Sequence, residues 1–374
     1  MDFTIIATAT FGLEKVVAQE LKDLGYDDLT IENGRVIFEG DEMDIVTCNI
    51  WLRTADRILI RMAEFKAESF EELYQGTLAV EWGDIIPITG YMHVTGKSVK
   101  SKLFSVPDCQ SIVKKAVVDA MKRKYRRDLF PETGAEYKIE IGILKDVATL
   151  TLDTSGPGLH KRGYRENAGE APLKETLAAA LVLLSKWNPD HQLADPLCGS
   201  GTIAIEAALI GRNIAPGINR SFVAEQWEII PQDLWDDVRS SARNLINNKS
   251  FRILASDIDT RVLRTARDNA EKAGVSDNIA FQKLDVRDFS SKKKYGYIIT
   301  NPPYGERLGE VSYVEELYKT MGKTFQELNS WYYYVLTSYE GFEKYFGQKS
   351  DKNRKLYNGR LLCYYYQYFP KNDK

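Results

Sequence analysis

The chain has 374 residues and a formal net charge of −3, and 44% of its residues are hydrophobic and 28% charged. A chain of this length and composition is expected to form two or three globular domains. No apolar run is long enough to predict a membrane-spanning helix, and the first five residues lack the positive region and cleavage site of a secretory signal. The overall charge does not by itself indicate a nucleic-acid partner, so the local distribution of charge has to decide that question.

Cysteine and histidine residues are few and scattered. The four cysteines show no C-x-x-C spacing, which argues against a disulfide framework or a zinc knuckle. The three histidines are too dispersed to predict a metal site, so no metal is expected. A reducing, cytoplasmic location is the simplest interpretation. The cysteines are Cys48, Cys109, Cys198 and Cys363, and the histidines are His93, His160 and His191.

The first part of the chain shows the short patterns of α+β structure. A helix is expected over 11–24, where apolar residues share one face and a glycine follows. A second helix is expected over 69–79, because Ser69 and the acidic pair at 71–72 suit a helix N-terminus. Residues of high β-propensity predict strands at 3–9, 34–38, 58–65, 137–143 and 147–152, the last two as a hairpin.

The segment 97–127 carries ten basic residues and two acidic ones, a net charge of +8 in an acidic protein. Apolar residues recur at helical spacing after Pro107, so a helix with one buried face and one basic face is expected. A basic helix face is often only a solvated surface, but the scarcity of compensating acids favours phosphate binding. The residues assigned to this role are Lys97, Lys100, Lys102, Lys114, Lys122, Arg123, Lys124, Arg126 and Arg127.

The turn-rich stretch 155–158 is the best candidate for a domain boundary. A second basic segment follows it and contains an aromatic residue. This segment adds Lys161, Arg162 and Arg165 to the residues predicted to bind RNA.

From about residue 171 onward, predicted strands and helices alternate, which is typical of a doubly wound parallel sheet. Asn358-Gly359 lies between two β-rich runs and predicts a hairpin turn in which both residues have positive φ. Strands are expected at 192–196, 252–256, 279–284, 295–300, 331–336, 355–357 and 361–369, and helices at 173–186, 201–211, 261–273 and 314–328.

The segment 193–204 is predicted to form a strand, a glycine turn and a helix rich in small residues. Gly199 and Gly201 allow a tight turn and a close approach of a ligand to the backbone, and the following helix offers free N–H groups. Gly199-x-Gly201-x-x-Ala204 also fits the dinucleotide-binding pattern. That pattern expects an acid about 20 residues later, and no such acid ends a nearby strand.

Three acids at successive strand tips favour S-adenosylmethionine (SAM) as the ligand, because such tips line one crevice. Asp195 can hold the amino-acid end of SAM, Asp257 the ribose hydroxyls, and Asp285 the adenine amino group. A single acid after a strand is often only a helix N-cap, so the ordered combination carries the prediction. The residues assigned to the cofactor are Asp195, Pro196, Cys198, Gly199, Ser200, Gly201, Thr202, Asp257, Ile258, Asp285, Val286 and Asn301.

Asn301-Pro302-Pro303-Tyr304 directly follows the predicted fourth strand of this sheet. The prolines fix the backbone, so the Asn301 side-chain oxygen and the Pro302 carbonyl can both accept hydrogen bonds from one exocyclic amine. Two such bonds localise the lone pair of the amine and aim it at a methyl donor. Tyr304 offers a flat face for the target base. Asn-Pro-Pro elsewhere is commonly a simple turn, but at this strand tip we predict that all four residues are catalytic.

These segments resemble the motifs of THUMP-domain class I RNA methyltransferases. The resemblance rests on Asp195-Pro-Leu-Cys-Gly-Ser-Gly-Thr202 and Asn301-Pro-Pro-Tyr-Gly-Glu-Arg307. The segments 101–110, 158–165, 171–176 and 213–217 are also similar, so the resemblance extends over nearly the whole chain. Within this family, the segments resemble those of the enzyme that makes N2-methylguanine in large-subunit rRNA and of its short bacterial homologues.

The resemblance implies three domains: a ferredoxin-like N-terminal subdomain (1–65), a THUMP RNA-binding domain (66–157) and a seven-stranded Rossmann-like catalytic domain (158–374). It implies that THUMP captures RNA and that the catalytic domain binds SAM. It also places the segment 172–176, which includes Leu173 and Thr176, beside the cofactor.

The leading functional hypothesis is SAM-dependent methylation of guanine N2 in 23S rRNA. A tRNA guanine-N2 methyltransferase and an adenine-N6 nucleic-acid methyltransferase are the alternatives within the same chemistry. A non-catalytic RNA-binding factor is opposed by the intact Asp195, Gly199 and Asn301. A dinucleotide-dependent oxidoreductase is disfavoured by the missing ribose acid.

Overall fold

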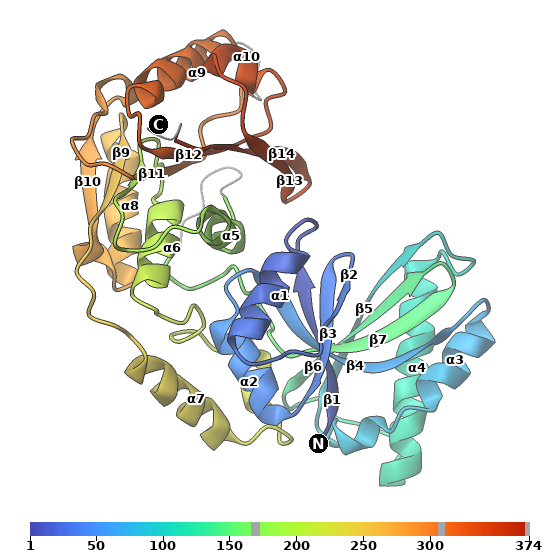
Figure 1. The fold of residues 1–374 in the computed structure, drawn as a ribbon. Coiled ribbons are helices and arrows are strands. Elements are labelled where there is room, and N and C mark those ends of the chain that lie inside the picture. The colour runs from blue at the N-terminus through green and yellow to red at the C-terminus, as the bar shows by residue number, and fades with distance from the viewer. Residues whose placement is uncertain (166–172, 306–310, 371–374) are drawn as a thin grey trace.

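The structure is a computed structural model that describes residues 1–165, 173–305 and 311–370. Figure 1 shows two lobes, an N-terminal lobe in blue to green and a C-terminal lobe in green to red. Each lobe is built around one seven-stranded sheet. Within these described ranges, no helix is long and apolar enough to cross a membrane.

The N-terminal sheet has the strand order β2-β3-β1-β4-β7-β6-β5, and neighbouring strands are antiparallel except β5 and β6. The central strand β4 pairs with β1 on one side and with β7 on the other. The predicted ferredoxin-like and THUMP segments therefore share one continuous sheet. Its strands are β1 (Phe3–Ala9), β2 (Thr30–Glu32), β3 (Arg35–Gly40), β4 (Ala55–Lys66), β5 (Tyr91–Val99), β6 (Glu136–Leu144) and β7 (Val147–Asp153), and the helices of this lobe are α1 (Glu14–Asp23), α2 (Glu42–Trp51), α3 (Phe70–Leu78) and α4 (Val106–Tyr125).

Helix starts in this lobe follow local chemistry. Ser69 caps α3 as predicted, and it forms a reciprocal capping box with Glu72. Asp41 and Asp44 form the same box at the start of α2, a helix that the sequence interpretation missed although this signal was present. Strands β2 and β5 were also missed, because their residues are largely exposed and give no apolar alternation.

The C-terminal sheet has the order β10-β9-β8-β11-β12-β14-β13. The first five strands in this order are parallel, and β14 runs antiparallel between β12 and β13. This is the Rossmann-like class I methyltransferase arrangement, so the predicted fold class is confirmed. The strands are β8 (Leu193–Asp195), β9 (Ile253–Asp257), β10 (Ile279–Lys283), β11 (Tyr297–Thr300), β12 (Tyr332–Thr337), β13 (Lys352–Asn358) and β14 (Leu361–Tyr368), and the helices are α5 (Glu175–Ser185), α6 (Thr202–Gly211), α8 (Thr260–Lys272), α9 (Val311–Gln326) and α10 (Phe342–Phe346).

Both faces of this sheet are buried, which is why its central strands are continuous apolar runs. On β11, Ile299 packs into the cluster formed with α5, α6 and α8, whereas Ile298 packs into the cluster formed with α9 and α10. The result is a three-layer domain whose strand tips are left to line a crevice.

Two details of the sequence interpretation need correction. The segment 212–251, hereafter the insertion, contains the unpredicted helix α7 (Gln232–Asn244), whose Trp235 and Val238 pack into the core of the N-terminal lobe. The hairpin turn consists of Gly359 and Arg360, one residue later than predicted, and Gly359 has φ +64° while Asn358 does not have a positive φ.

Candidate active site

The parallel strands β8, β9, β10 and β11 end at the same edge of the C-terminal sheet. Asp195 is the last residue of β8, and Asp257 is the last residue of β9. Asn301 follows the last residue of β11, and Asp285 lies two residues beyond β10. The structure therefore brings the three predicted acids and the predicted catalytic asparagine to one edge, as the strand order required.

The glycine turn after β8 is held against β9. The Cys198 N–H donates to the Ser256 carbonyl at 2.9 Å, and the Gly199 N–H donates to Asp257 Oδ2 at 3.1 Å. Gly201 has φ +82°, and a Cβ there would approach Ala266 of α8 at 3.1 Å. A side chain at Gly201 would be strained in both respects, so this glycine sets how closely α6 and α8 pack.

A cavity of about 180 Å³ lies at this turn. Six of the predicted cofactor residues line it, together with Leu173 of the segment expected beside the cofactor and two apolar residues that were not predicted. Because Asn301 is among the lining residues, the predicted cofactor and catalytic residues meet in one space. The lining residues are Leu173, Asp195, Leu197, Cys198, Gly199, Ser200, Thr202, Ile203 and Asn301.

Asp195 is almost completely buried beside this cavity, with 1% of its surface exposed. Its Oδ1 accepts a hydrogen bond from the Thr300 hydroxyl at 2.7 Å. Burial disfavours the charged form and raises the pKa of the Asp195 carboxyl to about 7. A cation in the cavity would favour the ionised carboxylate, so this residue suits the positively charged amino group of an amino-acid ligand.

The other predicted cofactor residues do not line this cavity. Asp257 is half-buried, and its Oδ1 also accepts from the Asp259 N–H at 3.0 Å. Arg287 donates to Asp285 and holds the pKa of that carboxyl below its usual range. Ile258 is half-exposed next to these acids. The remaining predicted residues, Thr176, Pro196, Gly201 and Val286, are buried.

Asn301 and Tyr304 are directly paired, which the sequence did not indicate. The Tyr304 hydroxyl donates to Asn301 Oδ1. It also accepts a hydrogen bond from the Cys363 thiol at 3.9 Å. Tyr304 therefore orients the amide oxygen, and a carbonyl oxygen with two lone pairs retains capacity for a second donor.

Pro303 is anchored from the neighbouring helix. The Tyr318 hydroxyl of α9 donates to the Pro303 carbonyl at 2.8 Å, and Pro302 is buried. Among the residues that the structure describes, no donor occupies the Pro302 carbonyl. The Pro302 carbonyl is therefore open to a donor from outside the described residues. Ala171, Pro172, Glu306 and Arg307 of the family-like motifs lie outside the described residues.

Two arginines predicted to bind RNA are instead buried in the C-terminal lobe. Arg165 pairs with Glu175 at 2.9 Å and donates to the Thr202 hydroxyl at 3.3 Å. Arg162 lies near the buried Glu206 and donates to carbonyls of the chain. A buried arginine needs such partners, so neither guanidinium is available to a phosphate in this structure. Lys161 is exposed.

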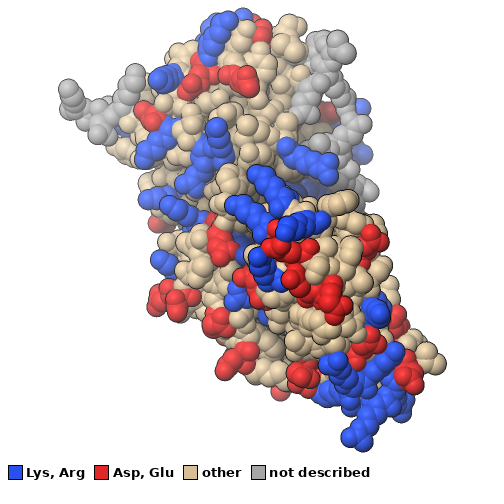
Figure 2. Space-filling model, turned by 90° about the vertical axis from the view of Figure 1, so that its right-hand side faces the viewer, with Lys and Arg blue, Asp and Glu red and all other residues tan. Residues whose placement is uncertain are grey.

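The basic segment around α4 carries fewer unpaired charges than its sequence predicts. Acids from outside the segment pair with Lys97, Lys102, Lys114 and Lys124, and Lys122 pairs with Asp119 within it. In the described part of the chain, no acid forms an ion pair with the remaining predicted residues, which are Lys100, Arg123, Arg126 and Arg127. Figure 2 shows basic side chains gathered at the lower end of the molecule, where α4 ends in Figure 1.

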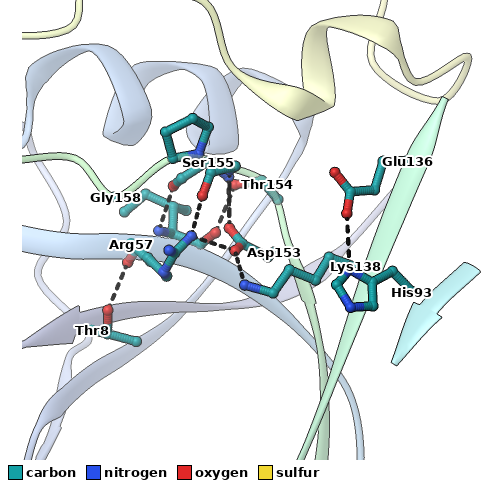
Figure 3. Close-up of polar contacts among 12 residues, drawn as sticks. Thr8, Arg57, His93, Glu136, Lys138, Asp153, Thr154, Ser155 and Gly158 are labelled. Carbon is teal, nitrogen blue, oxygen red and sulfur yellow. Dashed lines mark hydrogen bonds and ion pairs between the residues drawn. The ribbon is translucent and has the colours of Figure 1, made fainter. Parts of the chain in front are cut away.

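A larger cavity of about 660 Å³ lies where β5 and β6 meet the insertion. Figure 3 shows that its charged neighbours are paired: Arg57 and Lys138 both contact Asp153, and His93 contacts Glu136. It contains none of the predicted cofactor or catalytic residues. We interpret it as part of the junction between the lobe and the insertion.

The residues at the glycine turn fit SAM rather than a metal. A buried carboxylate for an amino group, an accessible carboxylate for hydroxyls, and a turn that leaves free space beside Gly199 suit an adenosyl amino acid. In the described residues, no group of three or more His, Cys, Asp or Glu side chains could hold a metal ion.

Comparison with known families finds three matches along the chain. Residues 4–59 match the RlmL ferredoxin-like domain, residues 67–153 match the THUMP domain, and residues 162–367 match the RMKL-like methyltransferase domain. The last match covers more than half of the chain.

Individual relatives are similar over nearly their full length. The Bacillus subtilis (strain 168) protein named "Putative RNA methyltransferase YpsC" is 55% identical, covering 99% of this chain and 96% of that protein. The solved structure of SMU.472 in complex with S-adenosylhomocysteine is 46% identical, with a TM-score of 0.95 and coverage of 100% and 99%. A Listeria monocytogenes structure, described as a predicted N6-adenine-specific DNA methylase, is 51% identical, with a TM-score of 0.95 and coverage of 99% and 97%.

Proposed function

Because the chain belongs to the RMKL-like methyltransferase family, in the form that carries ferredoxin-like and THUMP domains, we propose that it methylates a base exocyclic amino group in RNA, most specifically guanine N2 of 23S rRNA. SAM is its cofactor, and it is an RNA methyltransferase of the SAM-dependent class. The identity of the modified base, the identity of the RNA that carries it and the roles of individual residues are our proposal.

The position of Asn301 carries the proposal. It lines the same cavity as Asp195 and Gly199, and the prolines after it fix its backbone. When bound, SAM supplies an electrophilic methyl group. Asn301 Oδ1 and the Pro302 carbonyl would accept hydrogen bonds from the two N–H bonds of the amine, which frees its lone pair for attack. The proton leaves after transfer, so no strong base is required.

The RNA assignment is supported by the THUMP match over residues 67–153 and by the exposed arginines at the end of α4. Guanine N2 in 23S rRNA is preferred because of the resemblance to the large-subunit rRNA enzyme. The same acceptor pair also suits guanine N2 in tRNA and adenine N6, so these are the alternatives.

The decisive experiment is mass-spectrometric mapping of modified nucleotides in rRNA and tRNA from a deletion strain. We expect one N2-methylguanine in 23S rRNA to disappear, and to return with the wild-type chain but not with Asn301→Ala. A lost tRNA nucleotide or a lost N6-methyladenine would overturn the rRNA guanine assignment. An unchanged modification profile would overturn the proposed function.

Reversing Arg123, Arg126 and Arg127 to Glu is expected to weaken RNA binding by about 10- to 100-fold, because three phosphate contacts would become repulsive. The salt dependence of binding should become shallower, since each lost phosphate contact lowers the slope of log K against log salt by about 0.7 to 0.9. Filter binding to rRNA at several salt concentrations measures both.

The matched control replaces Lys292, Lys293 and Lys294 with Glu and so reverses their charges. These are exposed lysines in the loop before β11. It changes the net charge equally but leaves α4 intact. Equal weakening in both variants would show a non-specific charge effect, and unchanged binding in the arginine variant would place the RNA elsewhere.

A further inference from the structure

The loop between β1 and α1 of the N-terminal lobe is docked on the edge strand β13 of the catalytic sheet. Figure 1 shows the end of the β13–β14 hairpin beside this blue loop. The rings of Phe11 and Tyr357 meet edge to face, with centroids 5.9 Å apart. Gly12 lies so close to β13 that a Cβ would stand 2.9 Å from the Lys355 carbonyl oxygen.

The contact belongs to the catalytic core, not only to the surface. Leu13 is 1% exposed and, together with Val16, packs in the same cluster as Leu356 of β13, α5 and α6. The loop itself is held by Glu14, whose carboxylate accepts from the Gly12 and Gly34 N–H groups, both at 2.9 Å. A fixed loop from one lobe therefore sets the position of an edge strand in the other.

A short chain of contacts leads from this strand to the proposed catalytic residue. Leu356 of β13 is the direct partner of Cys363 on β14, and both side chains are fully buried. The Cys363 thiol donates to the Tyr304 hydroxyl at 3.9 Å, and that hydroxyl donates to Asn301 Oδ1. A displacement of β13 would therefore shift Asn301 Oδ1, the oxygen that is proposed to accept a hydrogen bond from the target amine.

We propose that the β1–α1 loop positions the active site: by docking on β13 it places Cys363 and Tyr304 so that Asn301 is correctly oriented. The RNA-capturing lobe then contributes to methyl transfer as well as to RNA binding. This inference rests on the proposed function, because it takes Asn301 to be a catalytic residue. Gly12, Leu13 and Cys363 are positioning residues, since each acts through another group.

The test compares Gly12→Ala with Gly25→Ala in the full-length protein. Gly12 has φ +92° and Gly25 has φ +100°, so alanine is strained alike at both positions, but a Cβ at Gly25 meets no atom within 4 Å. Only Gly12→Ala pushes against β13. We expect turnover on rRNA from the deletion strain, with saturating tritiated SAM, to fall about 10- to 100-fold in Gly12→Ala. Its SAM and RNA affinities, and the turnover of Gly25→Ala, should stay near wild type.

Phe11→Ala provides a second variant if Gly12→Ala does not fold, because Phe11 is 54% exposed. It should show a smaller loss of the same kind, in turnover and not in either affinity. Equal activity of Gly12→Ala and Gly25→Ala would overturn the inference, as would a loss confined to RNA affinity, which would make the loop an RNA contact. Asn301→Ala is assayed in parallel: if it retains turnover, the proposed function itself has failed.

Discussion

Asn301→Ala is expected to lower the rate of methyl transfer by about 100- to 1,000-fold, the usual cost of removing one preorganised hydrogen-bonding group from an active site. The variant loses the oxygen that accepts from Tyr304 and, in our proposal, from the target amine. SAM binding is expected to persist, because Asp195 and Asp257 remain in place. Single-turnover transfer to rRNA and calorimetric titration with SAM separate the two effects.

Asn301→Asp is the matched control for this prediction. Aspartate keeps an oxygen at the same position, so the bond from Tyr304 and one bond from the amine can still form. It should retain much more activity than alanine does. If Asn301→Ala turned over at the wild-type rate, the acceptor role would be wrong, and a joint loss of SAM binding would show that Asn301 acts mainly through the cofactor.

The strand-tip residues were predictable from the sequence because they depend on local signals. Short apolar runs separated by helical patterns predicted the parallel sheet, and the topology of such a sheet brings Asp195, Asp257 and Asn301 to one edge. Glycines at a strand-to-helix turn predicted the cavity beside Gly199. In each case the residue lies close in the chain to the sequence pattern that predicts its position.

The features that the sequence did not predict depend on partners far away in the chain. Lys124 looks like an unpaired cation until the fold brings Asp84 beside it. Arg165 looks like a phosphate ligand until Glu175 and Thr202 surround it. Helix α7 of the insertion was not predicted, because its apolar partners lie in the other lobe. Charge counts along a segment therefore overestimate a binding surface.

Asp195→Asn is expected to stabilise the ligand-free protein at pH 8 while weakening SAM binding. Burial raises the pKa of this carboxyl to about 7, so the folded state holds its proton more tightly than the unfolded chain, where the pKa has the ordinary value of 3.8. Stability from this group is therefore fully present below about pH 4 and is lost as the pH rises to 7. This pKa shift corresponds to a loss of roughly 4 kcal/mol in the free energy of unfolding. An uncharged asparagine would avoid that loss.

Binding should show the opposite dependence on pH. The ionised carboxylate suits the cationic amino group of SAM, so wild-type affinity should rise as the pH increases through 7. A charged hydrogen bond contributes about 1.5 to 3 kcal/mol, so Asp195→Asn should bind SAM about 10- to 100-fold more weakly at pH 8, with little dependence on pH. Urea unfolding and calorimetry at pH 5 and pH 8 measure both effects.

Asp285→Asn is the control, because ionisation of this carboxyl should affect stability in the opposite direction. Arg287 holds the pKa of the Asp285 carboxyl below its usual range, so ionisation stabilises the fold there and asparagine should not increase stability at pH 8. Because other titrating groups are common to all three proteins, the difference between each variant and wild type isolates one carboxyl. If Asp195→Asn were no more stable than wild type at pH 8, ionisation of the buried carboxyl would not destabilise the folded state as its surroundings indicate.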